Sequence, residues 1–320
     1  MNPPPPPRPL HPRLALYQAS DHKDDTVQVL QAFLDHLPRE GRILMERDIS
    51  QMTDLELKQH MISLVHQVLM PMMARRTPIT TPLSPRPGAQ AEVENQYSEM
   101  IETADRLKIL KAECLLRDDN KCTITLARDE ENNPPNTPGD LCNTQCCHIL
   151  PFSLSVFKSD AKARERAAVW VTLRRCFPIL DSLAIRFTHN DINDHRNQIT
   201  MDVAIHHLFG AFNFSLVATR IPNQYTIHLW KPQKLRLIRH ITSVTFSAHG
   251  TRFPLPSPEL IEIHHTVAQI LHASGRAGWI RAVLDDLDDT SVLASDGSTN
   301  LTDLLWGTDL ALMGGLIHVN

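Results

Sequence analysis

His148, Asn197 and His206 carry side chains that could act together on a phosphate ester. His148 ends a short apolar segment, Asn197 lies in a later loop, and His206 lies on the helix expected to follow. A neutral imidazole can take a proton from water, and a second can bind a divalent cation that neutralises the charge formed at phosphorus. The Asn side chain could bond the backbone of the intervening loop or hold the ring of His148 in one tautomer. The three residues therefore predict a metal-dependent centre for phosphodiester hydrolysis.

Two short strands and one helix are expected to position these side chains. Residues 121–126 (KCTITL) and 145–150 (QCCHIL) are predicted to be strands that pair as a hairpin across a long loop at 128–144. A polar loop at 189–196 then leads to a helix over 202–209 that carries His206. If both histidines belong to one metal site, their side chains should lie about 5 to 8 Å apart across a metal-sized gap. Positions on opposite faces would contradict that arrangement.

Three segments resemble a known family. They are LLRDDNKCTIT (115–125), CHILPF (147–152), and the N-x8-H spacing that leads into IHHLFGAF (205–212). Together they resemble the HNH endonuclease superfamily, the ββα-metal nucleases, and more narrowly an HNH subfamily abundant in fungal proteins. The sequence from 255 to 275 also resembles the tail of such fungal proteins. The resemblance covers about two thirds of the chain and is strongest over residues 107–214.

The resemblance implies an α+β fold with a ββα-metal (HNH) core and a helical insertion, flanked by N-terminal helices and a C-terminal β-plus-helix region. His148 matches the general base, Asn197 the structural Asn of the catalytic motif, and His206 the metal-binding His. His207 points about 100° away from His206 on a helix, so only one of the two can be the ligand. The family spacing selects His206. The implied function is hydrolysis of phosphodiester bonds in nucleic acid, with DNA expected, and the cofactor is a divalent metal ion (Mg, Mn, Ni or Zn).

Cys147 departs from the family pattern. Many HNH enzymes carry a metal-binding Asp, Glu or His at this position, and a thiolate favours zinc over magnesium. Cys147 is therefore a candidate metal ligand together with His206. Gly210 also stands where many relatives have Asp. These differences motivate an alternative function: a catalytically decayed HNH scaffold that binds nucleic acid or another protein.

Contacts with nucleic acid must come from a local patch, because the formal net charge of the chain is −4. The basic candidates for phosphate contacts lie on a helix predicted over 160–177 and two residues before it: Lys158, Lys162, Arg164, Arg174 and Arg175. A solvated helix face is the competing interpretation of the same residues, since Asp160 and Glu165 interrupt the basic run.

The six cysteines include no C-x-x-C pair, and the start of the chain is not a secretory signal. No apolar run approaches the roughly 20 residues of a membrane span. We therefore expect a protein with reduced thiols in the nucleus or cytoplasm and no membrane partner. A structural zinc site is a further alternative for four of the cysteines: Cys122, Cys142, Cys146 and Cys147.

Composition divides the chain into five predicted regions. These are a disordered Pro-rich tail (1–13), an N-terminal helical region (14–74), a linker (75–91), an HNH nuclease-like domain (92–250) and a C-terminal helical region (251–320). Apolar periodicity predicts helices over 26–37, 54–69, 92–117, 259–271 and 279–287. Strand character is predicted over 212–219, 224–230 and 240–246.

Overall fold

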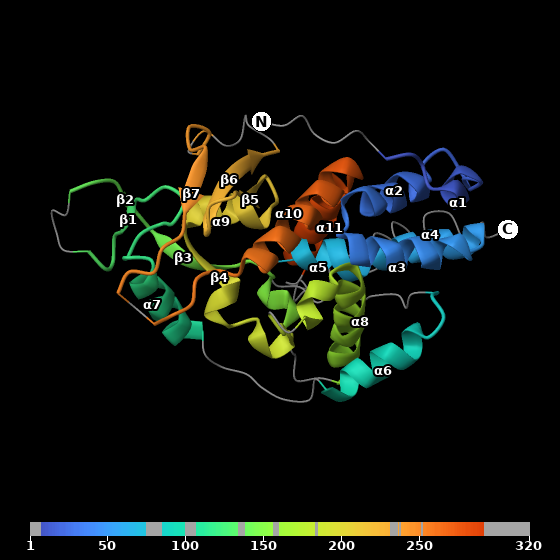
Figure 1. The fold of residues 1–320 in the computed structure, drawn as a ribbon, viewed down its shortest axis with the longest axis horizontal. Coiled ribbons are helices and arrows are strands. Elements are labelled where there is room, and N and C mark those ends of the chain that lie inside the picture. The colour runs from blue at the N-terminus through green and yellow to red at the C-terminus, as the bar shows by residue number, and fades with distance from the viewer. Residues whose placement is uncertain are drawn as a thin grey trace, which may run out of the picture. The chain divides into compact units, whose positions relative to one another are not determined.

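The computed structural model describes residues 8–74, 85–99, 107–133, 138–155, 160–182, 185–230, 236, 238–250 and 252–290. Most of the predicted Pro-rich tail and most of the predicted linker lie outside these residues, as does everything after residue 290. Two compact units are present. The first comprises residues 1–99, 167–178 and 269–320, and the second comprises residues 100–166 and 179–268. Helices and small sheets make up the described residues, so the predicted α+β class is confirmed (Figure 1).

The first unit is helical. Its helices are α1 (Pro12–Ala15), α2 (Thr26–His36), α3 (Arg39–Ser50), α4 (Asp54–Leu64), α5 (Met70–Met73), α6 (Ala89–Glu99) and α11 (Arg276–Thr290). Two further helices, α8 (Asp160–Cys176) and α10 (Pro258–Ala273), each contribute residues to both units. None of the helices described is long and apolar enough to cross a membrane.

Helix α4 begins and ends for local reasons. The Thr53 side chain accepts a bond from the backbone of Glu56, whose side chain bonds back to the Thr53 backbone. This capping box satisfies two backbone donors that a helix start leaves unpaired. The helix predicted over 54–69 extends further than expected, because a π-helical turn (Val65–Leu69) and α5 continue it to Met73. Pro71 lies in the first turn of α5, directly after the π-helical turn.

The second unit contains all the strands described. They are β1 (Arg128–Asp129), β2 (Leu141–Cys142), β3 (Thr144–His148), β4 (Gln198–Asp202), β5 (Phe214–Ala218), β6 (Gln224–Leu229) and β7 (Ser243–Thr245). The pair β1–β2 is parallel, β3–β4 is antiparallel, and β5–β6–β7 form an antiparallel sheet of three strands. Helices α7 (Leu107–Arg117) and α9 (Val203–Gly210) belong to the same unit. The predicted strands at 212–219, 224–230 and 240–246 are confirmed.

The predicted hairpin is wrong. Residues 121–126 form turns, and Leu126 has a positive φ of 62°, which a strand does not accept. The second predicted strand exists as β3, but it pairs with β4, on the far side of the insertion, with His148 opposite Gln198. The strand propensity of residues 145–150 does not determine which segment they pair with, and only the tertiary structure decides this. The predicted helix over 92–117 is represented by α6 and α7, and residues 100–106 between them lie outside the described part.

Candidate functional site

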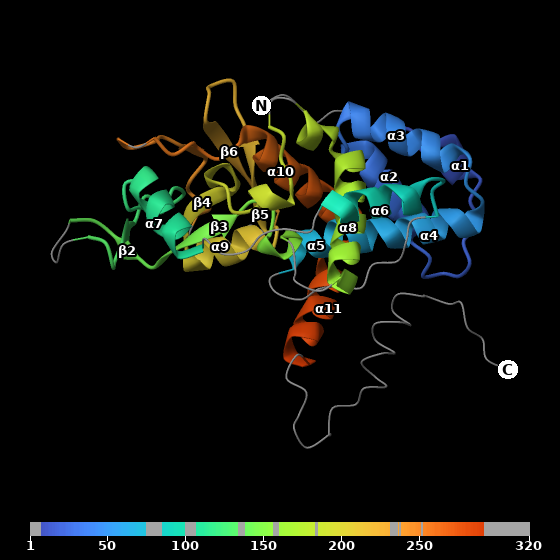
Figure 2. The same ribbon diagram turned by 90° about the horizontal axis from the view of Figure 1, so that it is seen from below.

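The strand pair β3–β4 lies between two helices. Figures 1 and 2 both show β3, β4 and α9 side by side, and α7 also contacts the pair. Side chains alternate between the two faces of a strand. Cys147 therefore shares a face with Gln145, and Cys146 shares the other face with His148. Cys147, Ile199 and Met201 are each 0% exposed, which makes the first face part of the apolar core.

Asn197 is fully buried and joins the ends of the two strands. Its Oδ1 accepts a hydrogen bond from Leu150 N at 2.8 Å. Its Nδ2 donates to Leu150 O and to Ile192 O, both at 2.9 Å. Asn197 was expected either to bond the backbone of the loop or to hold the ring of His148. The structure shows the bonds to the backbone.

His148 is held by a residue that the sequence interpretation missed. The Nε2 atom of His148 lies 3.0 Å from Oδ1 of Asn193, in the loop before β4. An amide oxygen only accepts, so the imidazole donates from Nε2. Burial lowers the pKa of His148, and the bond to Asn193 opposes that shift. The polar loop HNDINDHR was the available signal, but several of its side chains could have served equally well.

His206 lies on α9, as predicted, and its Nδ1 atom lies 2.8 Å from Oε1 of Gln145. Asp202 begins this helix by accepting bonds from the backbone N–H groups of Ala204 and Ile205. The far end of α9 is fixed by His264, whose ring stacks on Phe209 at 3.8 Å between centroids. His264 Nε2 also bonds to Phe209 O at 3.2 Å. Helix α9 is thus anchored at both ends.

His148 and His206 each bond to a carboxamide side chain. His148 bonds to Asn193, and His206 bonds to Gln145, which lies three residues before His148 on β3. The metal-sized gap expected between the two rings stays a prediction.

Cys147 does not fit a metal ligand. Its side chain is 0% exposed, its thiol donates to His148 O at 3.6 Å, and burial raises the pKa of the thiol well above its usual range. A ligating cysteine must be deprotonated. Across the part of the chain that the structure describes, no three His, Cys, Asp or Glu residues gather so as to hold a metal ion. The described donors therefore do not gather as the alternative four-cysteine zinc site requires, and the predicted pairing of Cys147 with His206 stays a prediction.

Arg117 is a central structural residue of this unit. Its guanidinium is 0% exposed on its side chain and pairs with Asp118 at 2.7 Å. The same group donates to three backbone carbonyls: His195 O at 2.9 Å, Gln198 O at 3.0 Å and Pro254 O at 3.1 Å. Arg117 thus connects the end of α7 to the loop before β4 and to the first residue of β4. Arg117 is therefore one way in which α7 supports the site.

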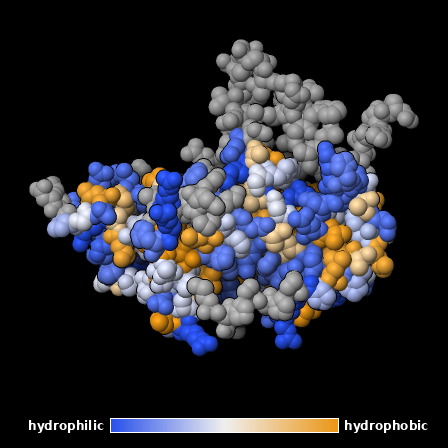
Figure 3. Space-filling view, turned by 90° about the horizontal axis from the view of Figure 1, so that it is seen from above, coloured by the Kyte–Doolittle hydropathy of each residue, from blue (hydrophilic) through white to orange (hydrophobic). Residues whose placement is uncertain are grey.

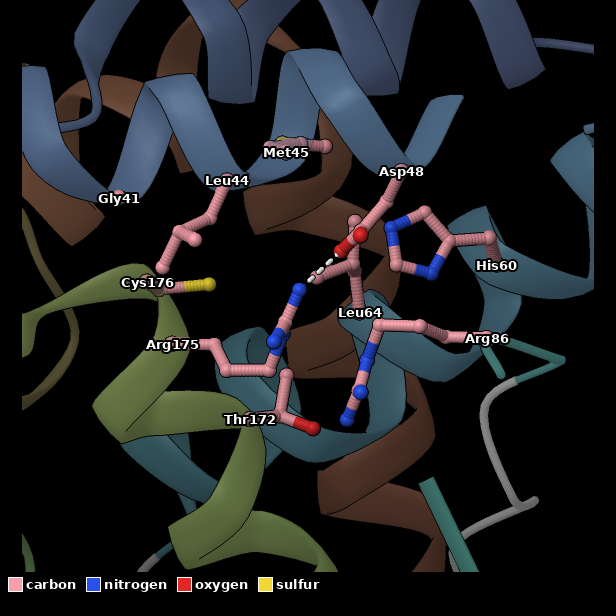
Figure 4. A pocket seen from close by; sticks show the side chains of 10 residues that line it. All are labelled: Gly41, Leu44, Met45, Asp48, His60, Leu64, Arg86, Thr172, Arg175 and Cys176. Carbon is pink, nitrogen blue, oxygen red and sulfur yellow. Dashed lines mark hydrogen bonds and ion pairs between the residues drawn. The ribbon is translucent and has the colours of Figure 1, made fainter. Parts of the chain in front are cut away.

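Two of the predicted phosphate contacts have partners within the first unit. Arg175 pairs with Asp48 across a pocket between α3, α4 and α8, where His60 and Arg86 also lie (Figure 4). The guanidinium of Arg174 lies 5.7 Å from the ring centroid of Trp170. Arg164 is exposed. Lys158 lies outside the described residues, and the side chain of Lys162 is also outside them.

Hydrophilic side chains and separate groups of hydrophobic ones share the face drawn in Figure 3. Exposed apolar residues in the second unit include Leu126 and Ile109, at 68% and 65% exposure. Single exposed apolar side chains are ordinary on protein surfaces, so these two alone indicate no partner.

Comparison with known proteins supports the family assignment for one segment. Residues 122–217 match the family model described as HNH endonuclease. No curated protein and no solved structure matches the chain. The matched segment contains β3, β4, α9 and the three residues singled out by their chemistry. Over residues 122–217, the chain is therefore similar to HNH endonucleases.

Proposed function

We propose that residues 122–217 form a nuclease domain that hydrolyses phosphodiester bonds in DNA with the help of a divalent metal ion. In this proposal β3, β4 and α9 are the ββα-metal core. The observation that carries it is the oriented imidazole of His148 within a segment that matches the HNH family. Antiparallel pairing of β3 with β4, followed directly by α9, supports the same assignment.

His148 acts in this proposal as the general base. With a proton on Nε2 and a bond to Asn193, the ring carries its lone pair on Nδ1. Burial lowers the pKa of the ring, so it is neutral at physiological pH and can accept a proton from water. Asn197 keeps the loop and the end of β3 together while this happens.

The HNH family implies a divalent cation, and His206 is the remaining candidate ligand once Cys147 is set aside. A single imidazole does not complete the coordination of a cation. Hard cations such as Mg²⁺ are often bound by one or two protein groups together with substrate phosphates. We propose that the cation binds together with nucleic acid, so the protein alone should bind it weakly.

The experiment is cleavage of supercoiled plasmid with Mg²⁺, Mn²⁺, Ni²⁺ or Zn²⁺. His148→Ala should lower the rate by about 10²- to 10⁴-fold, because general-base catalysis contributes that much. His206→Ala should raise the cation concentration needed for cleavage. His207→Ala, which changes the neighbouring imidazole on the same helix, is the matched control and should cleave like the wild type. Equal cleavage by wild type and His148→Ala would rule the assignment out.

A second candidate function is a decayed HNH scaffold that binds nucleic acid or protein without cutting. The burial of Cys147, at a position where a metal ligand was expected, favours it. A wild-type protein that shifts DNA in a gel, cuts it with none of the four metals, and binds no metal would establish this function instead. Location in the nucleus or cytoplasm stays a prediction.

A further inference from the structure

We infer that Asn193 is a positioning residue that fixes the ring orientation and tautomer of His148, and that Asn197 acts on His148 through it. The inference rests on the proposed function, since it assigns His148 a task that needs one defined nitrogen. It concerns a residue outside the His148, Asn197 and His206 set.

The first step is the bond itself. Oδ1 of Asn193 lies 3.0 Å from Nε2 of His148, within normal hydrogen-bond distance. Because the amide oxygen can only accept, the bond is made by the tautomer with its proton on Nε2. The Nδ1 lone pair is then the basic site of the ring. Rotating the ring by half a turn would break this bond, so Asn193 selects one orientation as well as one tautomer.

The second step is what holds Asn193. The preceding carbonyl, Ile192 O, accepts hydrogen bonds from Asn197 Nδ2 at 2.9 Å and from Gln198 Nε2 at 3.1 Å. Ile192 itself is 1% exposed, so its side chain anchors the loop in the core. Two buried amides therefore fix the backbone directly before Asn193.

The third step is the start of the same loop. Thr188 and Asp191 form a capping box, in which Thr188 N donates to Asp191 Oδ2 at 2.8 Å. Asp194 in turn accepts from Arg196 N at 2.8 Å. Hydrogen bonds on both sides of Asn193 thus define its position. A chain of contacts runs from Asn197 through Ile192 O and Asn193 to the His148 ring.

The wild-type protein tests the inference by NMR of histidine ring nitrogens. A hydrogen-bonded Nε2–H proton should be visible for His148 and should disappear in His148→Gln, which assigns it. The signal should survive in Asn193→Asp, which keeps an acceptor oxygen, and should be lost in Asn193→Leu, which removes it. Asn190→Ala, in the same loop, should leave the signal unchanged. A His148 ring protonated on Nδ1 in the wild type would overturn the inference.

Activity provides a second readout. Asn193→Leu should lower kcat by about 10- to 100-fold with little change in KM, because misplacing a catalytic group costs on that order. Asn193→Asp should recover part of that loss. The two proposals fail separately. A wild type that shows the Nε2–H signal but cuts no DNA removes the nuclease function alone, whereas cleavage without the signal removes the role of Asn193.

Discussion

At the scale of single residues, the environment of a side chain decides what its chemistry can do. Cys147 and His148 are neighbours in sequence, yet one is sealed in the core and the other is oriented by Asn193. Strand alternation produces this difference, since adjacent residues point to opposite faces. Cys147, which was predicted to be a metal ligand, is therefore a small apolar residue of the core.

Cys147→Ala tests that conclusion. The metal dependence of cleavage should stay the same, because a buried, protonated thiol contributes no ligand. Stability should fall by no more than about 1 to 2 kcal/mol, the scale of removing one small buried group. The measurements are cleavage against metal concentration and urea unfolding. A changed metal preference would show that Cys147 does bind the cation.

Arg117 is expected to contribute strongly to the stability of the second unit. Arg117→Leu leaves the buried Asp118 carboxylate and three carbonyls without their donor. Removing one partner of a buried ion pair costs about 3 to 5 kcal/mol. Urea unfolding should show this loss, and Arg220→Ala, at an exposed arginine of the same unit, should change stability by less than about 0.5 kcal/mol. A loss below about 1 kcal/mol for Arg117→Leu would mean that the carbonyls find other donors.

At the scale of elements, helices are held by close packing at a few points. In the first unit α3 approaches the end of α8 so closely that a Cβ on Gly41 would overlap the backbone oxygen of Cys176. The atom met is backbone, which cannot move aside as the tip of a side chain can. Gly41 is therefore required by tertiary packing. The residues around it in the sequence do not indicate this requirement.

The pair Gly41→Ala and Gly278→Ala separates packing from helix propensity. Gly41→Ala should destabilise by at least about 1 to 3 kcal/mol, the usual cost of overpacking. Gly278 is in α11, and an added Cβ would meet nothing within 4 Å. Gly278→Ala should therefore stabilise by about 0.5 to 1 kcal/mol, since Ala favours helix over Gly. Thermal or urea unfolding of both variants measures the difference, and a stabilised Gly41→Ala would refute the close approach.

At the scale of the whole molecule, each unit contains a buried histidine that links stability to pH. Burial lowers the pKa of His60 in the first unit to about 4, with a further contribution from Arg86. In the second unit, burial lowers the pKa of His264 to about 3. An unfolded histidine titrates near pH 6.5. As the pH falls through that value, the unfolded chain gains a proton that the folded chain excludes, so folding becomes less favourable.

The expected loss is about 2 kcal/mol per histidine between about pH 7 and pH 5. His264→Phe keeps an aromatic ring against Phe209 and Phe212 but cannot titrate. The pH-dependent loss in the second unit should therefore shrink by about 2 kcal/mol in this variant. Urea unfolding at the two pH values makes the comparison. An unchanged pH dependence would show that His264 is protonated in the folded protein or unaffected by unfolding.

The sequence by itself determined the elements whose patterns are local. Apolar spacing predicted α2 and α10, and strand-forming residue types predicted β5, β6 and β7. Residue types and spacing also selected His148, Asn197 and His206, which the match to the HNH family contains. These features depend on residues a few positions apart, so they can be predicted directly from the sequence.

Only the tertiary structure decided the rest. The pairing of β3 with β4 joins segments on both sides of an insertion, and local propensity does not choose between possible partners. The burial of Cys147 and the bond that His148 donates to Asn193 are found only in the folded chain. A one-residue change of register reverses the face of every side chain, so the chemistry of the site is fixed by which strands meet and in which register.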